Sequence, residues 1–114
     1  MRTLALTVLM LCASAAAASQ TWVLTRAEWA GPLNAQRVIA LAPVRSAVHA
    51  LDAASGSRIL VAHNGGEEGL FWASNLEGWL VALGVPAARI VDRSAGVPPN
   101  EIHLELLPPA AGAP

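Results

Sequence analysis

The segment 63–68 holds the side chains of this chain that are most capable of chemistry. They are His63, Asn64, Glu67 and Glu68. An imidazole and two carboxylates can bind a metal ion, but a metal site needs three or four rigidly held ligands. The intervening pair Gly65-Gly66 leaves no fixed i, i+4 geometry between the histidine and the acids. We therefore expect these four side chains to contribute to a binding surface, with no metal and no cofactor.

Nucleophilic catalysis has little support in the pattern of the remaining polar residues. It requires a nucleophile, a base and a group that orients the base. None of the serines lies in a nucleophile elbow or a comparable motif with one of the three histidines. We expect a protein that is not an enzyme. A small enzyme is the alternative, and it would show a pocket that holds a histidine or glutamate with a perturbed pKa.

Tryptophan dominates the aromatic side chains, since the chain has four tryptophans, one phenylalanine and no tyrosine. Trp72 and Trp79 fall on one side of a helical pattern, so we expect them in the core. Trp29 lies near a loop and is the candidate for an exposed aromatic that contacts a protein or a glycan. The alternative for Trp29 is a lid over the edge of the core.

The hydrophobic pattern predicts the element order β-α-β-α-β-β. The expected strands cover 21–26, 58–62, 90–91 and 101–106, and the expected helices begin at Pro43 and Glu67. The second strand is almost entirely apolar, which is typical of a central strand covered on both faces. The first and last strands are candidate edge strands that pair with another chain. The fold class that we expect is α+β, an α/β sandwich with two helices packed on one face of a small mixed sheet.

The first residues have the pattern of a cleavable secretory signal peptide. Arg2 precedes a short apolar run, and small residues follow it as far as Ala18. The run is too short to cross a bilayer, so we expect no stable membrane anchor after cleavage. Cys12 follows Leu11, which is too large for a lipoprotein cleavage site, so the mature chain has neither a cysteine nor a disulfide. The expected location is periplasmic or secreted.

The expected organisation is a signal peptide over 1–18, a single domain over 19–107 and a disordered tail over 108–114. The tail contains only Pro, Ala and Gly, which form no core. Seven arginines stand against eight acidic residues, and lysine is absent. Because no basic patch follows from this balance, we expect no nucleic-acid partner.

Three short motifs carry a family resemblance. They are the apolar strand 59–63 that ends in His63, the turn Gly84-Val85-Pro86 after the second helix, and Asn100 before the last strand. With these motifs the segment 44–106 resembles the peptidoglycan-binding domains that are similar to outer-membrane protein A (OmpA-like domains). The resemblance implies a small α/β domain that binds the diaminopimelate of peptidoglycan through an aspartate and an arginine.

This chain departs from that family at both ligand positions. Gly65 stands where the resemblance places the aspartate, and Trp72 stands where it places the arginine. Neither side chain can pair with an ammonium or a carboxylate group. We therefore expect an exported interaction or structural module of the cell envelope, whose partner is an envelope protein or peptidoglycan. The alternative is a peptidoglycan-binding module that uses substituted residues, recognisable by a basic residue that faces an acid, or by exposed hydrogen-bond donors, across the 63–68 turn.

Overall fold

The computed structural model describes residues 20–109. The expected signal peptide over 1–18 and residues 110–114 of the expected tail lie outside this range. Pro108 and Pro109 belong to no helix or strand. Among the described residues, no helix is both long enough and apolar enough to cross a membrane.

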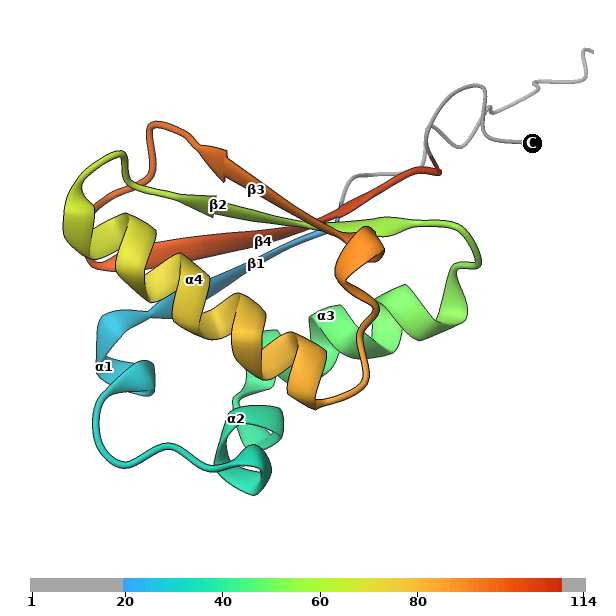
Figure 1. Ribbon diagram of the computed structural model, residues 1–114, viewed down its shortest axis with the longest axis horizontal. Helices are drawn as coiled ribbons and strands as arrows, with labels where there is room; N and C mark the ends of the chain where they lie inside the picture. Colours follow the sequence, from blue (N-terminus) through green and yellow to red (C-terminus); the bar gives the residue numbers. More distant parts are fainter. Residues whose placement is uncertain (1–19, 110–114) are drawn as a thin grey trace, which may run out of the picture.

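A four-stranded mixed sheet forms one layer of the domain (Figure 1). Its strands are β1 (Thr21–Thr25), β2 (Arg58–His63), β3 (Ile90–Ser94) and β4 (Glu101–Leu107), in the order β1-β4-β2-β3. β2 and β3 are parallel, whereas β4 is antiparallel to both β1 and β2. The expectation of β4 as an edge strand is wrong, because β4 pairs on both sides. The edges of the sheet are β1 and β3.

Two long helices cover one face of this sheet (Figure 1). They are α3 (Ala42–Ala53), with Pro43 in its first turn, and α4 (Glu67–Ala82). The expected α+β class, with two main helices against a mixed sheet, is therefore confirmed. A 3-10 turn, η1 (Ala87–Arg89), leads from α4 toward β3.

Two short helices occupy the segment between β1 and α3, where the sequence predicts a loop. α1 (Arg26–Trp29) begins with a capping box in which the Thr25 and Glu28 side chains each bind the backbone of the other. α2 (Ala35–Ala40) is capped by Asn34, whose side-chain oxygen accepts a hydrogen bond from the Arg37 backbone N–H over 2.8 Å. Local capping therefore makes helical turns in a segment whose composition is typical of loops.

The main core lies between the sheet and the helices. The sheet supplies fully buried side chains such as Leu24, Val61, Ile102 and Leu104, and the helices supply Val44, Leu51, Leu76 and Leu80. The alternating pattern of β4 therefore places its apolar residues inward as predicted. On the opposite face of β2, Leu60 and Ala62 pack against Val97 from the loop before β4. β2 is thus covered on both faces, as its continuous apolar sequence predicts.

Arg89 joins the end of α3 to η1. Its Nε donates to the Ser57 carbonyl over 2.8 Å, and its Nη2 donates to the carbonyls of Leu51 and Ala54 over 2.9 and 3.0 Å. The last carbonyl groups of a helix have no partners within the helix. The carbonyls of Leu51 and Ala54 accept from the backbone N–H groups of Ala54 and Ser57. Arg89 adds a charged donor from a position far along the chain and so fixes the α3–β2 turn against η1.

Candidate functional site

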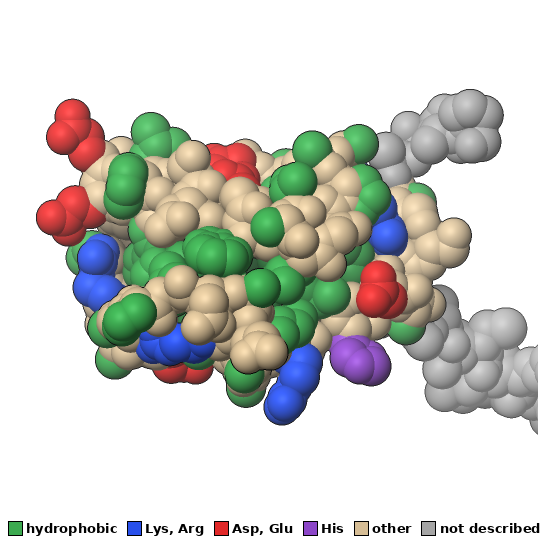
Figure 2. All heavy atoms as spheres, turned by 60° about the horizontal axis from the view of Figure 1, so that its bottom comes forward, with side chains coloured by type: hydrophobic (Ala, Val, Ile, Leu, Met, Phe, Trp, Pro, Cys, Tyr) green, Lys and Arg blue, Asp and Glu red, His purple; other side chains and the backbone are tan. Residues whose placement is uncertain are grey.

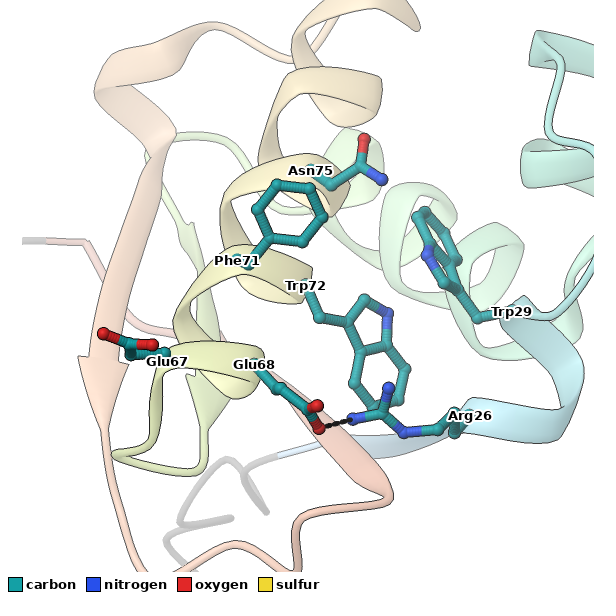
Figure 3. A pocket seen from close by; sticks show the side chains of 7 residues that line it. All are labelled: Arg26, Trp29, Glu67, Glu68, Phe71, Trp72 and Asn75. Atoms are coloured by element: carbon teal, nitrogen blue, oxygen red, sulfur yellow. Dashed lines mark ion pairs between the residues drawn. The ribbon is translucent and has the colours of Figure 1, made fainter.

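A pocket of about 580 Å³ opens between α1 and the N-terminal half of α4 (Figure 3). Its lining consists of Arg26, Trp29, Glu67, Glu68, Phe71, Trp72 and Asn75. Figure 2 shows hydrophobic side chains gathered near the middle of the face turned toward the reader, with acidic side chains standing out at its left end. The pocket therefore combines an aromatic interior with a charged rim.

Three aromatic rings of different exposure line the pocket. Trp72 is 4% exposed and belongs to the core cluster, as its helical spacing predicts, while one side of its ring lines the pocket. Phe71, the next residue along α4, is 75% exposed. Trp29 is partly buried and packs against the core, which is the position of a lid over the core edge. Its ring nevertheless faces the pocket (Figure 3).

The charged side chains of the rim come from the starts of two helices. The Arg26 guanidinium carbon lies 5.1 Å from the centre of the Trp72 ring, within the range of a cation–π contact. Arg26 Nη2 lies 3.8 Å from Glu68 Oε2 and donates to the Pro99 carbonyl over 3.1 Å. Glu67 and Glu68 occupy the first turn of α4, where the helix dipole favours negative charge. A basic residue of α1 thus lies beside an acid in the first turn of α4.

Arg37 holds the segment that carries Trp29. Its guanidinium donates to the Pro32 carbonyl over 2.8 Å and to the Glu28 carbonyl over 3.1 Å, and it also bonds the Ala30 carbonyl. Five N–H donors in a fixed fork suit a guanidinium to such a set of carbonyls. The position of Trp29 at the pocket therefore depends on a residue of α2.

His63 and Asn64 do not line the aromatic pocket. His63 is 2% exposed, with Nδ1 2.8 Å from the Asn64 carbonyl oxygen and Nε2 2.7 Å from Asp92 Oδ1. The Asn64 side chain donates to the Val97 carbonyl over 3.1 Å and accepts from the Gly66 N–H over 3.0 Å. Both residues therefore shape the turn that leads into α4.

Glu77 completes a titratable cluster with His63 and Asp92. Burial of His63 by itself lowers the pKa of the imidazole, but the bonds to Asn64 and Asp92 outweigh burial, and the net pKa is raised above the ordinary 6.5. Burial and the neighbouring Asp92 carboxylate raise the pKa of Glu77 from 4.5 to about 7. Glu77 lines a separate, smaller pocket of about 250 Å³ with Gly78, Val81, Ala87 and Ile90. Glu77 thus places a carboxyl group with a perturbed pKa in a pocket, which is the feature expected of the small-enzyme alternative, although neither Glu77 nor His63 lines the aromatic pocket.

The five residues singled out from the sequence thus separate into two sets. Trp29, Glu67 and Glu68 come together at the aromatic pocket, whereas His63 and Asn64 support the turn that precedes α4. Sequence reasoning missed the roles of Arg26, Phe71 and Asn75 in the lining, and those of Asp92 and Glu77 around the buried His63. Within residues 20–109, no group of three histidine, cysteine or acidic residues is placed to hold a metal ion.

Comparison of the chain with protein-family models, with curated proteins and with solved structures found no match.

Proposed function

We propose that this chain is an exported, non-enzymatic binding module of the cell envelope, and that the pocket between α1 and α4 is its ligand site. The observation that carries the proposal is the meeting of three aromatic rings with charged groups of both signs in one pocket. Aromatic and arginine side chains dominate the binding energy of most interfaces. The secretory pattern of residues 1–18 supports export.

The carboxylates at the rim favour a ligand with a positive charge. We infer that this ligand is an apolar segment of an envelope protein, and that the segment carries an ammonium or guanidinium group. Glu67 and Glu68 are exposed carboxylates beside the exposed ring of Phe71. A cation that enters there gains a carboxylate partner and the face of an aromatic ring together. Trp72 Nε1 is buried without a hydrogen-bond partner among the described residues, so a ligand acceptor that reached it would satisfy this donor.

Binding of peptidoglycan is the second candidate, and the position of Arg26 opposite Glu68 favours it. A stem peptide carries both an ammonium and a carboxylate group. The acids at 67 and 68 suit the ammonium, and Arg26 suits the carboxylate. The guanidinium over Trp72 would then replace the arginine that the family resemblance places at position 72.

Co-sedimentation of the purified mature domain with peptidoglycan sacculi tests the two candidates. Peptidoglycan binding is favoured if the domain sediments with the sacculi, if a diaminopimelate-containing peptide abolishes this sedimentation, and if Trp29→Ala weakens it. Without sedimentation, a photo-crosslinker placed at Phe71 is expected to capture an envelope protein, and Glu67→Gln with Glu68→Gln is expected to reduce the capture. The matched control is a crosslinker at the exposed Arg45 on α3. Equal capture at both positions, or none at Phe71, contradicts the proposed ligand site.

Export is tested separately by fractionating cells that make the whole chain. The expected result is a chain in the periplasm or medium that begins close to Ser19, read by N-terminal sequencing. A chain that keeps Met1 and stays in the cytoplasm contradicts the proposed location.

A further inference from the structure

The surroundings of His63 require protons on both nitrogens of its ring. Nδ1 faces the Asn64 carbonyl oxygen at 2.8 Å, and Nε2 faces Asp92 Oδ1 at 2.7 Å. A carbonyl and an ionised carboxylate only accept hydrogen bonds, so each ring nitrogen must donate. The imidazolium form satisfies both contacts. The side chain is 3% exposed, so its charge is held inside the domain mainly by Asp92.

A neutral His63 keeps only one ring proton and must lose one of these two bonds. The bond to the charged Asp92 carboxylate is stronger than the bond to a neutral carbonyl, so the proton stays on Nε2. The lone pair of Nδ1 then faces the Asn64 carbonyl oxygen at hydrogen-bond distance, and both atoms carry partial negative charge. Loss of the proton therefore makes Nδ1 and the Asn64 carbonyl oxygen repel each other, which favours displacement of the 63–66 turn. The hydrogen bond to Asp92 on β3 is retained.

The Asn64 carbonyl lies directly against the first turn of α4. Gly69 is buried, and a Cβ on it would collide with this carbonyl oxygen. The Asn64 side chain also holds the N–H of Gly66, the residue that caps α4 just before Glu67. A displaced carbonyl must therefore shift the start of α4, which carries the acidic rim of the aromatic pocket.

We propose that the protonated ring of His63 holds the acidic rim of the pocket in place and thus acts as a pH-dependent lock. The charged ring holds the 63–66 turn and fixes Glu67 and Glu68, and the neutral ring releases the turn and lets the rim rearrange. This inference rests on the proposed function only in treating the rim as part of a ligand site. The lock itself follows from the hydrogen bonds of the turn.

The charged groups that face His63 come from two elements. Asp92 on β3 bonds the ring directly, and Glu77 on α4 adds a weaker electrostatic contribution. Both acids raise the pKa of His63, so the release is expected above pH 6.5. The pKa of Glu77 is itself raised to about 7, so its ionisation falls in the same range and strengthens the hold on the imidazolium.

Nitrogen-15 NMR of the mature domain, without any ligand, tests the lock. The ring nitrogens of His63 and the backbone amides of Gly66, Glu67 and Glu68 are followed from about pH 5 to 9. The expected result is a shared midpoint for the ring and the amides, with an Nε2–H tautomer above it. Asp92→Asn is expected to lower the midpoint of His63 by about 1 to 3 pH units, and the midpoint of the amides with it.

Two variants separate this titration from others in the chain. Glu77→Gln removes the ionisation of Glu77, so the transition that remains at the rim belongs to His63. His49→Gln on the exposed side of α3 is the matched control and is expected to leave the response of the amides unchanged.

Rim amides that do not follow the midpoint of His63, or that keep the wild-type midpoint in Asp92→Asn, overturn the proposal. A neutral ring in the Nδ1–H form overturns it too. Because no ligand enters this experiment, its failure leaves the proposed ligand site standing, and failure of the sacculus and crosslinking tests leaves the lock standing.

Discussion

The guanidinium of Arg26 lies over the indole of Trp72, with 5.1 Å between the guanidinium carbon and the ring centre. This contact joins the residue that follows β1 to the second turn of α4, so the two sides of the aromatic pocket meet through one cation–π pair (Figure 3). Glu68 pairs with the same guanidinium at 3.8 Å. The pocket is therefore held at its mouth by contacts between residues that are far apart in the sequence.

Arg26→Ala is expected to lower the free energy of unfolding by about 0.5–1 kcal/mol, because it removes the cation–π contact and an exposed ion pair. Urea denaturation followed by circular dichroism measures the change. Arg45→Ala, at an exposed site on α3, is the matched control and is expected to have a smaller effect. Equal effects of the two substitutions would show that the contact with Trp72 contributes nothing.

Two glycines of α4 are expected to respond to alanine in opposite directions. At Gly69 a Cβ would collide with the Asn64 carbonyl, so Gly69→Ala is expected to destabilise the domain by about 1–3 kcal/mol. At Gly78 a Cβ would meet nothing within 4 Å, so Gly78→Ala is expected to stabilise by about 0.5–1 kcal/mol through helix propensity. Thermal unfolding of both variants measures the difference. A tolerated alanine at 69 would contradict the close approach of α4 to the turn.

Arg89→Ala is expected to lower the free energy of unfolding by about 2 kcal/mol. The variant leaves the carbonyls of Leu51, Ala54 and Ser57 without the charged donor that now binds them. Denaturant titration gives the size of the loss. Arg93→Ala, on the exposed part of β3, serves as the control. A loss no larger than that of Arg93→Ala would show that water replaces the guanidinium at no cost.

The free energy of unfolding is expected to fall as the pH rises from 4.5 to above 7. The pKa of Glu77 is raised from 4.5 to about 7 in the folded chain, so the folded chain holds this proton longer than the unfolded chain does. The pKa of His63 is raised above 6.5, so the stabilisation by its imidazolium is complete below 6.5 and is lost as the pH passes the folded value. Denaturation curves across this range measure the slope.

Glu77→Gln is expected to flatten the lower part of that profile, since an amide does not ionise, and to leave the part due to His63. His103→Gln, which removes the histidine paired with Glu101 over 2.9 Å on β4, is the control for the histidine part. Stability that stays constant or rises between pH 4.5 and 7 would be incompatible with a proton held at Glu77.

Several parts of the fold follow from the sequence because they depend on local patterns. The alternation of 101–106 places Ile102 and Leu104 in the core, and the spacing of Trp72 and Leu76 gives the buried face of α4. Gly84 ends that helix with a positive φ of 103°, a conformation that glycine adopts readily. The two short helices were missed because their caps, at Thr25 and Asn34, involve polar residues that are equally common in loops.

The sequence by itself determined the order of the four strands and the two long helices, and the acidic start of α4, because periodicity and helix-end preferences act over a few residues. Only the tertiary structure decided which side chains meet. The parallel register of β2 and β3 pairs Val61 with Asp92, and this places the Asp92 carboxylate beside His63. The return of the chain through α1 sets Arg26 and Trp29 beside Trp72. Such contacts depend on strand order and helix packing, which residue types along a single segment do not specify.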